Sequence, residues 1–574
     1  MEEDKILNNH IDNKLQKNNE QNIFYSNISF NNTQNFKDLK TKETEKISFK
    51  NLNIEENVSK ELTKYLIERN IDPNLLVWRR LNKIFKAPKL LKSFDFNFEF
   101  QDINLTSEIF LSLTLGLSQH SWHIQNLFKT FEINKDGIYT LCLNINGIWK
   151  DISISDKIPC LKLETDNYLP LICTNKQEEL WPILIEKALA TFYQTYFFIK
   201  KNDENPLKFF KELLGAPFFE LHKEENLKQI WNELKLANNN NWVILAKKKE
   251  KNQKHNFDIV LHTYEIKEEE IVTKELIKIN ELDFNSVKKT KENFASSKNS
   301  QNILDKKLRT VQILPKWLRF DSFFEIYEKI NICQIDPKYK YSSIKLSMRN
   351  KLNIIVFKVK QQNEFYFSVN QPDIIFGKKI LGDNWEYGKI RVTLGKLEKN
   401  ELQYIDCRFS NKRNIFQNCH LFPGFYIFLV ETYYPKEIYN NKNSNNNLLS
   451  IETFNQEDEE NNFYFSLSCY SKNSIDFSLK ENPEKYFKKL EYKIWRDFFY
   501  LNKDKFLYKN EKKIEEGLNQ VILKRYNYDT SKFGIRIEGV YNDCFKSNSV
   551  YIIWKIKKLI GADLITQGKN KTLY

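Results

Sequence analysis

The chain has 574 residues, a length that typically corresponds to three or four structural units of about 150 residues each. Its hydrophobic content is 41% and its aromatic content is 14%, which suffices for several buried cores and excludes a wholly disordered chain. The 89 Lys and Arg residues exceed the 75 Asp and Glu residues by 14, but acidic residues are interspersed nearly everywhere. Without a concentrated basic stripe, the charge predicts no nucleic-acid partner and at most a weak attraction to acidic surfaces.

Residues 1–75 are predicted to be a disordered polar tail. Residues 1–60 are rich in Asn, Lys, Glu and Gln and contain neither Pro nor Gly. Within the tail, residues 61–70 have the pattern of a short helix. The N-terminus has no apolar signal core, and no run of 18 apolar residues follows, so we expect a soluble, cytoplasmic protein.

Residues 76–225 are predicted to form a mainly helical unit. The segment 108–117 is apolar on most sides, which indicates a buried helix. The alternation over 137–159 around Asn146-Gly147 indicates a β-hairpin. A helical period over 179–197 places four apolar residues on one face: Trp181, Leu184, Ile185 and Ala188.

The rest of the chain is predicted to be rich in strands. Residues 226–338 contain three strand-like runs (242–246, 257–266 and 275–280), a polar loop at 283–310 and a turn that leads into a helix at 314–330. Short strands at regular spacing over 339–479 favour a β-sandwich. Residues 480–574 form a basic region of unknown fold; from residue 481 onward, 20 basic and 12 acidic residues give 20 − 12 = +8.

The cysteines are widely spaced, at Cys142, Cys160, Cys173, Cys333, Cys407, Cys419, Cys469 and Cys544. No CxxC pair occurs, and no Cys/His cluster has the spacing of zinc ligands. This pattern favours reduced thiols over disulfides or a zinc site.

A series of short segments follows one another in a recognisable order between residues 78 and 435. They are Trp78-Arg79-Arg80 with Ile84 and Pro88, Gly137-Ile138-Tyr139, Gly147-x-Trp149, Asp156-x-x-Pro159, Glu179-Leu180-Trp181 with Glu186-Lys187-Ala188, Tyr196, Leu214-Gly215, Trp317 with Phe320, Phe323 and Ile332-Cys333, and Pro423-Gly424-Phe425-Tyr426 with Thr432 and Pro435. This order resembles the calpain family of cysteine peptidases. The resemblance implies an α+β fold: a papain-like core of two subdomains, residues 76–225 and 226–338, followed by an antiparallel β-sandwich, residues 339–479.

The resemblance also shows where catalytic residues are expected. Calpains use a cysteine thiolate at a helix start, a histidine base, an orienting asparagine and an oxyanion donor. The segment from Gln101 to Ser112 resembles the family's Q-G-x-L-G-D-C-W-F-L-S-A. Aligned on Phe110-Leu111-Ser112, it places Glu108 at the nucleophile; aligned on Gln101, the oxyanion position, it places Ser107 there. Neither residue is cysteine, and both glycines of the sharp turn are missing.

The other two catalytic segments are changed as well. His255 resembles the family's histidine, and His262 is a rival match that lies too close to the next strand. The orienting residue corresponds to Asn280 or, in strict register, to Glu281. The family's Pro-Trp-Gly after this position is absent, so the tryptophan that shields the histidine and asparagine is missing. We therefore interpret the three catalytic segments as degenerate.

Calcium binding is the remaining property that the resemblance allows. No D-x-[DN]-x-[DN]-G loop occurs, which excludes EF-hands. The acidic run Glu457-Asp458-Glu459-Glu460 is interpreted as a solvated loop. Calcium thus remains possible by resemblance only, and no other cofactor is expected.

The favoured hypothesis is a catalytically inactive calpain-like protein that acts as an intracellular scaffold or binding protein with protein partners. One alternative is an active calcium-dependent cysteine-type endopeptidase, which would need a cysteine from outside the motif. Another is a module that binds anionic membrane surfaces through the β-sandwich and its basic residues.

Overall fold

The computed structural model describes most of the chain between residues 54 and 480, with short strands on either side. The described ranges are 45–47, 54–91, 98–100, 105–118, 121–163, 167–175, 178–198, 208–223, 226–249, 257–268, 271–283, 309–310, 312–374, 377–378, 385–398, 401–434, 464–480, 508–516, 519–530, 535–542, 550–551 and 572–573. Some sequence predictions fall outside them: the first part of the polar tail, Gln101, His255, most of the 283–310 loop and the acidic run at Glu457.

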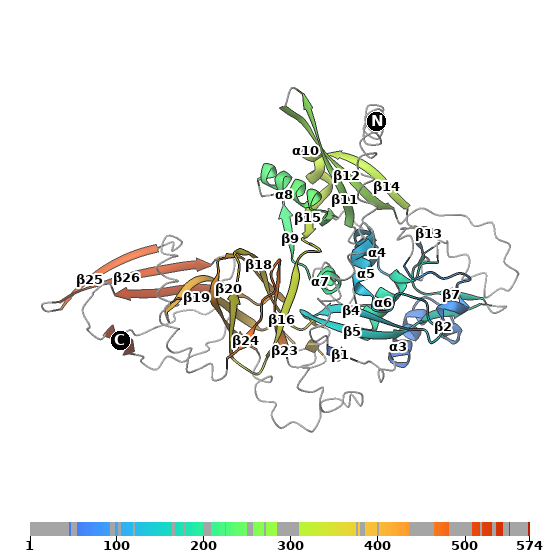
Figure 1. Ribbon diagram of the computed structural model, residues 1–574, viewed down its shortest axis with the longest axis horizontal. Coiled ribbons are helices and arrows are strands. Elements are labelled where there is room, and N and C mark those ends of the chain that lie inside the picture. The colour runs from blue at the N-terminus through green and yellow to red at the C-terminus, as the bar shows by residue number, and fades with distance from the viewer. Residues whose placement is uncertain are drawn as a thin grey trace, which may run out of the picture.

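Helices and three small sheets form the first subdomain, on the right of Figure 1. Its helices are α3 (Ile54–Ile67), α4 (Glu108–Ser118), α5 (Ser121–Leu127), α6 (Trp181–Tyr193) and α7 (Lys208–Leu214), with 3-10 turns at Pro73–Leu75 and Leu81–Lys83. Its sheets are β1 (Glu45–Ile47)-β5 (Ile148–Ser155)-β4 (Ile138–Ile145), β2 (Leu76–Arg80)-β6 (Lys157–Lys162)-β7 (Tyr168–Pro170) and β13 (Arg309–Thr310)-β3 (Phe98–Phe100)-β8 (Thr174–Asn175).

The individual elements predicted for this subdomain are confirmed, but the unit is not mainly helical, because strands β2 to β8 lie between its helices. The helix expected at 108–117 is α4, and the apolar face predicted from 179–197 lies on α6, where Trp181, Leu184 and Ala188 are fully buried. The hairpin forms with β4 and β5 joined through Asn146 and Gly147, whose φ angles are 49° and 78°. Positive φ at both central residues is the requirement of a tight hairpin turn that matches strand twist.

The first core begins earlier in the chain than predicted. Helix α3 contains the short helix expected near residues 61–70, and it places Val58, Leu62 and Leu66 in the core with no exposed surface. The prediction of a disordered tail through residue 75 was therefore wrong from residue 54 onward. Polar composition concealed an amphipathic helix, because its apolar residues occupy one narrow face.

A six-stranded antiparallel sheet with two helices forms the second subdomain, at the top of Figure 1. In spatial order its strands are β14 (Gln312–Arg319), β12 (Ile271–Asp283), β11 (Phe257–Glu268), β10 (Val243–Lys248), β15 (Tyr327–Cys333) and β9 (Phe218–His222); its helices are α8 (Leu227–Asn239) and α10 (Phe320–Ile326). Strand β10 has two buried faces. Val243 and Leu245 join the core of the first subdomain, whereas Ile244 and Ala246 join the core of the second. This alternation packs the two subdomains against each other.

Two antiparallel sheets form the predicted β-sandwich. One has the order β16 (Lys340–Ser347), β23 (Tyr464–Ser471), β18 (Asn363–Asn370), β21 (Asn414–Leu421); the other has the order β20 (Glu401–Ser410), β19 (Lys389–Glu398), β22 (Gly424–Tyr433), β17 (Leu352–Val359), β24 (Ser478–Leu479). Aromatic side chains such as Phe357, Phe367 and Phe428 fill the space between the sheets. The α+β fold expected from the resemblance is thus present. Further strands lie near the C-terminus: β25 (Tyr508–Glu516), β26 (Asn519–Thr530), β27 (Ile535–Asn542), β28 (Val550–Tyr551) and β29 (Thr572–Leu573).

A buried polar seam joins the sandwich to the first subdomain. Arg413, before β21, forms ion pairs with Glu212 of α7 at 2.7 Å and with Asp373 at 3.2 Å. It also donates a hydrogen bond to Asn146 Oδ1 in the β4–β5 turn, and the Tyr193 hydroxyl donates to Glu212. Because the ionic groups are 6% exposed or less, the two units are locked together by charges that have no access to bulk water.

The same seam leaves no room for a side chain at Gly147. A Cβ atom there would lie 2.1 Å from the Asn370 amide and 2.3 Å from the Ser466 hydroxyl. Lys211 of α7 donates hydrogen bonds to Ser368 and Asn370 of β18. Burial, together with the nearby Arg413 charge, holds the pKa of Lys211 well below its usual value. The β4–β5 turn and α7 therefore form a rigid base for the sandwich.

Candidate functional site

Helix α4 begins at the position predicted for the nucleophile. Ser107 is its N-cap: its hydroxyl accepts a 3.1 Å hydrogen bond from the Phe110 N–H, and its carbonyl accepts a 3.2 Å hydrogen bond from the Leu111 N–H. Glu108 is the first helical residue. A serine cap followed by a carboxylate is a stable way to begin a helix, because the hydroxyl satisfies a free N–H and the helix dipole favours an anion there.

The residue before this helix start is hydrogen-bonded to a buried carboxyl, that of Glu186. The Thr106 hydroxyl donates a 2.8 Å hydrogen bond to Glu186 Oε2 of α6 and accepts a 2.8 Å hydrogen bond from the Cys173 N–H. Burial raises the pKa of Glu186 to about 8, and the Thr106 hydrogen bond opposes that rise. The carboxyl is therefore largely protonated at neutral pH. Sequence analysis assigned no role to Thr106, because its contact with Glu186 spans 80 residues and leaves no local signal.

Helix α4 contacts the strand that follows the predicted histidine. Its contacts are with β10 and β11 of the second subdomain. Asn280 of β12 lies opposite Ile259 of β11 in the strand register, and Glu281 follows it. His262, the rival histidine, lies opposite Lys278 beside a register shift in β11. His255 and Gln101 lie outside the described residues, so the predicted set is placed only in part.

Most of the described cysteines lie in buried surroundings, and five of them have raised thiol pKa values. Six of these seven cysteines are buried, and Cys407 is half-buried. Burial raises the pKa of the Cys160 and Cys419 thiols to about 12, and it also raises the pKa values of Cys333, Cys407 and Cys469. Cys173 is the cysteine whose backbone contacts the start of α4, but its side chain is 3% exposed within the core. A nucleophilic thiol needs the opposite environment, one that lowers its pKa.

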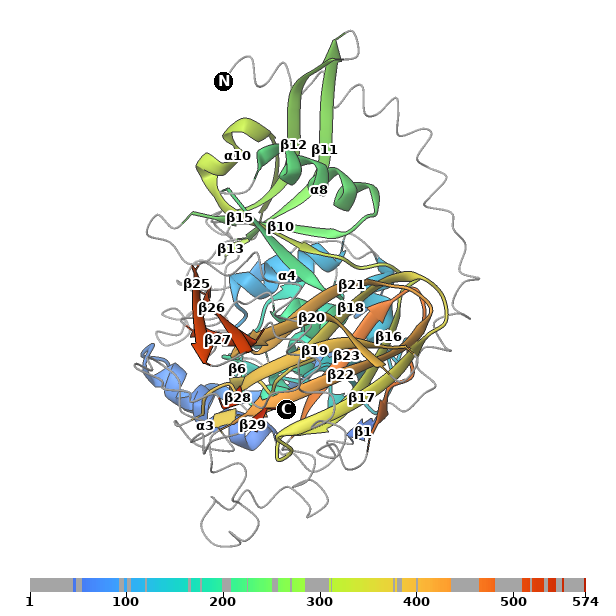
Figure 2. The same ribbon diagram turned by 90° about the vertical axis from the view of Figure 1, so that its left-hand side faces the viewer.

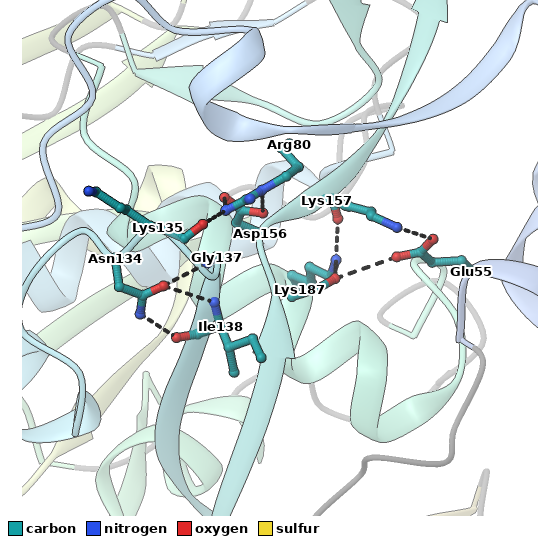
Figure 3. A network of polar contacts seen from close by, with 10 residues as sticks. Glu55, Arg80, Asn134, Lys135, Gly137, Ile138, Asp156, Lys157 and Lys187 are labelled. Carbon is teal, nitrogen blue, oxygen red and sulfur yellow. Dashed lines mark hydrogen bonds and ion pairs between the residues drawn. The ribbon is translucent and has the colours of Figure 1, made fainter.

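The residues that carried the resemblance have structural roles in the first subdomain. The Arg80 guanidinium forms a bidentate pair with Asp156 at 2.9 and 3.2 Å, and it also donates to the Lys135 carbonyl (Figure 3). A Cβ atom at Gly137, whose φ is +67°, would lie 2.1 Å from Arg80 Nη2 and 2.4 Å from Asp156 Oδ1. Asn134 accepts a hydrogen bond from the Gly137 N–H. The pair therefore requires glycine at this turn.

Lys187 of α6 lies in a second polar network, next to the N-terminal turn of α3. Its ammonium donates hydrogen bonds to the Ser155 hydroxyl, at 3.0 Å, and to the Lys157 carbonyl (Figure 3). Glu55 of α3 pairs with the Lys157 ammonium at 3.5 Å. Burial lowers the pKa of Lys187 to about 7, while the negative charges of Glu55 and Asp156 oppose the change. Lys187 thus ties α6 to β5 and β6 beneath α3.

Neither a metal centre nor a membrane-spanning helix is found in the described part of the chain. No three His, Cys, Asp or Glu side chains come together there as possible metal ligands. The calcium allowed by the resemblance therefore has no assignable ligand set in these ranges, and no step of a mechanism is derived through it. Among the same residues, no helix combines the length and the apolar character that crossing a membrane requires.

Comparison with known proteins agrees with this arrangement. Residues 57–334 match the model of a family described as calpain family cysteine protease. The chain is 36% identical over 87 residues to the calpain-type cysteine protease DEK1 of Zea mays and to that of Arabidopsis thaliana. It is 34% identical over 87 residues to the calpain-type cysteine protease ADL1 of Oryza sativa subsp. japonica.

Each match covers 15% of this chain and 4% of the relative, so the chain spans only a small part of those proteins. The matched family region begins within α3 and ends after β15, so it contains both subdomains and the contacts between α4 and β11. Residues 57–334 of this chain are therefore a domain of the calpain family of cysteine proteases.

Proposed function

We propose that this chain is a catalytically inactive calpain-like protein that acts as an intracellular scaffold or binding protein. The observation that carries the proposal is the start of α4, where Ser107 caps the helix and Glu108 is its first residue. A carboxylate is a poor nucleophile towards an amide. The Ser107 hydroxyl accepts a hydrogen bond from the Phe110 N–H and so acts as a helix cap.

The alternative, an active calcium-dependent cysteine-type endopeptidase, requires a thiol from elsewhere in the fold. Cys173 is one candidate, because its backbone N–H donates a hydrogen bond to Thr106 just before α4. It is 3% exposed within the apolar core, so its side chain has little surface to present to a substrate. The scaffold around Arg80, Asp156 and Lys187 supports a retained fold, since its hydrogen bonds involve no residue of the start of α4.

Casein turnover tests the proposal. The purified chain is incubated with casein in the presence and absence of calcium, and each reaction is repeated with an epoxysuccinyl thiol inhibitor. We expect no turnover that the inhibitor removes. Inhibitor-sensitive cleavage that persists through purification would contradict the proposal, and its loss in a Cys173→Ser variant would identify the alternative nucleophile.

A second candidate function, binding to anionic membrane surfaces, is favoured by the β21–β22 turn of the sandwich. Phe422 and Phe425 are 54% and 51% exposed there. The Lys358 ammonium lies 5.3 Å from the centre of the Phe425 ring, and the Tyr426 hydroxyl donates a 2.7 Å hydrogen bond to the Phe422 carbonyl. Exposed aromatic rings beside a cation suit the interface of an anionic bilayer.

Vesicle sedimentation distinguishes this candidate from protein binding. If the sandwich binds membranes, the unchanged chain should sediment with vesicles that contain phosphatidylserine. The double variant Phe422→Ser/Phe425→Ser should remain in the supernatant. Phe131→Ser is the matched control, because Phe131 is 59% exposed but lies in the first subdomain. Equal sedimentation of the double variant and the control would remove this candidate.

A further inference from the structure

One outer face of the β-sandwich is apolar and buried. It belongs to the sheet in which β20, β19, β22 and β17 lie side by side (Figure 2). Ile355 of β17 and Phe428 of β22 are part of the core between the two sheets. Because side chains alternate along a strand, Ile354, Ile427 and Leu429 face the opposite way. They are nevertheless only 1%, 5% and 1% exposed.

The residues of this face form a continuous apolar cluster. Ile354 lies directly opposite Leu429 in the strand register, and Val356 lies opposite Ile427. We call the cluster the outer patch; its residues are Ile354, Val356, Leu397, Tyr404, Ile427 and Leu429. Among the side chains that the structure describes, those of the cluster all come from this one sheet. An apolar sheet face is stable when another element packs on it.

The described chain leaves the sandwich at the edge of the outer patch. Strand β24 pairs with β17, with Ser478 opposite Val356 and Leu479 opposite Ile355. The Lys480 N–H then donates a 2.9 Å hydrogen bond to the Ile354 carbonyl. The next described range begins at residue 508. The segment that follows residue 480 therefore starts beside the patch.

The sequence of that segment has the pattern of an amphipathic helix. Asn482-Pro483 is a helix-start signal, with Asn as the cap and Pro in the first turn. Apolar residues then recur at intervals of three, four, four and three, at Phe487, Leu490, Ile494, Phe498 and Leu501. A helix over 483–501 would be about 28 Å long at 1.5 Å per residue. That length is enough to cross a sheet of five strands spaced about 4.8 Å apart.

We propose that residues 483–501 form an amphipathic helix that docks on the outer patch through these five apolar residues. The patch and the helical face are complementary in character, and the hydrogen bond of Lys480 fixes where the segment begins. The docked helix would attach the basic C-terminal region to the sandwich. The inference goes beyond the proposed function and does not depend on the loss of catalysis at α4.

Photocross-linking with the full chain tests the contact directly. The photoreactive residue p-benzoylphenylalanine replaces Val356 in one variant and Tyr404 in another, both half-buried members of the patch. After irradiation and digestion, mass spectrometry should find the label joined to peptides from residues 483–501 of the same chain. The same group at Phe131, which is 59% exposed in the first subdomain, is the control and should not label them.

Limited subtilisin digestion gives a second readout. Ile494→Ser with Phe498→Ser should be cut within 483–501 at least about tenfold faster than the unchanged chain, because cleavage follows the population of the undocked form. Lys489→Ser with Arg496→Ser is the matched control. These residues lie on the opposite side of the helix, so the rate should stay unchanged.

Three results would overturn the proposal. The first is a cross-link from the patch to residues 508–574 or to a second copy of the chain instead of 483–501. The second is no cross-link from either position. The third is an equal digestion rate for the two double variants.

Discussion

The network around Arg80 and the start of α4 lie in the same subdomain. The residues of the network match calpain motifs, whereas those at the start of α4 do not. In the network, Arg80, Gly137 and Asp156 match family motifs and contact one another directly. At α4, the positions aligned with the family's nucleophile hold Ser107 and Glu108. The groups of the network have structural contacts, whereas Ser107 and Glu108, at the position predicted for the nucleophile, suit a helix start.

The difference indicates that the contacts which hold this fold together are separate from the residues at the start of α4. Buried ion pairs and close-packed glycines are necessary for this arrangement, because removing one member leaves an uncompensated charge or a clash. The nucleophile contributes to catalysis and little to stability. Substitutions in the two regions should therefore affect different measurements.

The largest expected effect is on stability, at α6. Trp181→Ala should lower the free energy of unfolding by about 3–5 kcal/mol, because it empties a large buried volume. It also removes the 3.0 Å hydrogen bond from the indole N–H to Glu179, whose side chain is fully buried. Urea denaturation measures the change. Phe131→Ala is the control and should stay within about 0.5 kcal/mol, because that ring is mostly exposed. Similar losses for both variants would refute the packing assigned to α6.

A second large effect should appear where the sandwich meets the first subdomain. Arg413→Met should cost about 3–5 kcal/mol, because Glu212 and Asp373 would be left buried without their counter-charge. The control is Arg319→Met, which breaks an ion pair with Asp321 whose two side chains are 60% and 62% exposed. That change should cost less than about 1 kcal/mol. If Arg413→Met matched the control in thermal or urea unfolding, the seam would not be a stabilising joint.

The pH dependence of stability should show two opposite slopes from neighbouring residues of α6. The folded pKa of Glu186, about 8, lies above its ordinary value of 4.5, so stability falls as pH rises through that window. The folded pKa of Lys187, about 7, lies below its ordinary value of 10.5, so stability rises between those values. In each of these pH ranges, the free energy of unfolding can change by about 1.4 kcal/mol per pH unit.

Urea denaturation at a series of pH values separates the two contributions. Glu186→Gln should flatten the falling limb, and Lys187→Met should flatten the rising limb. Glu68→Gln, at an exposed site, should leave both unchanged. A falling limb that persists in Glu186→Gln would show that another group is responsible for it.

The smallest expected effect is at the site where the family has its nucleophile. Glu108→Cys should produce no casein turnover, even though it returns a thiol to the start of α4. The oxyanion turn lacks its glycines, and a lost oxyanion donor alone costs roughly 10²–10³ in rate. Catalytic groups act as a unit, so one restored member is not sufficient.

Iodoacetamide labelling of Glu108→Cys across pH gives an independent readout. We expect a thiol pKa near the reference of about 8.5. A value well below this reference, together with calcium-dependent turnover, would mean that the catalytic site is better preserved than proposed. The start of α4 would then match the calpain family as well as the Arg80 network does.

Local patterns in the sequence were sufficient to predict much of the fold. The period of 179–197 predicted the buried face of α6, and Asn146-Gly147 predicted the β4–β5 turn. The absence of cysteine at Ser107 and Glu108 is a property of the sequence, whereas their assignment to the nucleophile position stays a prediction. These features depend on residues close together in the chain, whose spacing is fixed by helix and strand geometry.

Contacts between distant residues were decided only by the tertiary structure. The hydrogen bond from Thr106 to Glu186 spans 80 residues, and the pair of Arg413 with Glu212 spans 201. Composition also placed the end of the polar tail too late, because the burial of α3 depends on the core it meets. No periodicity encodes such pairings, since they arise when separate elements pack around a shared core.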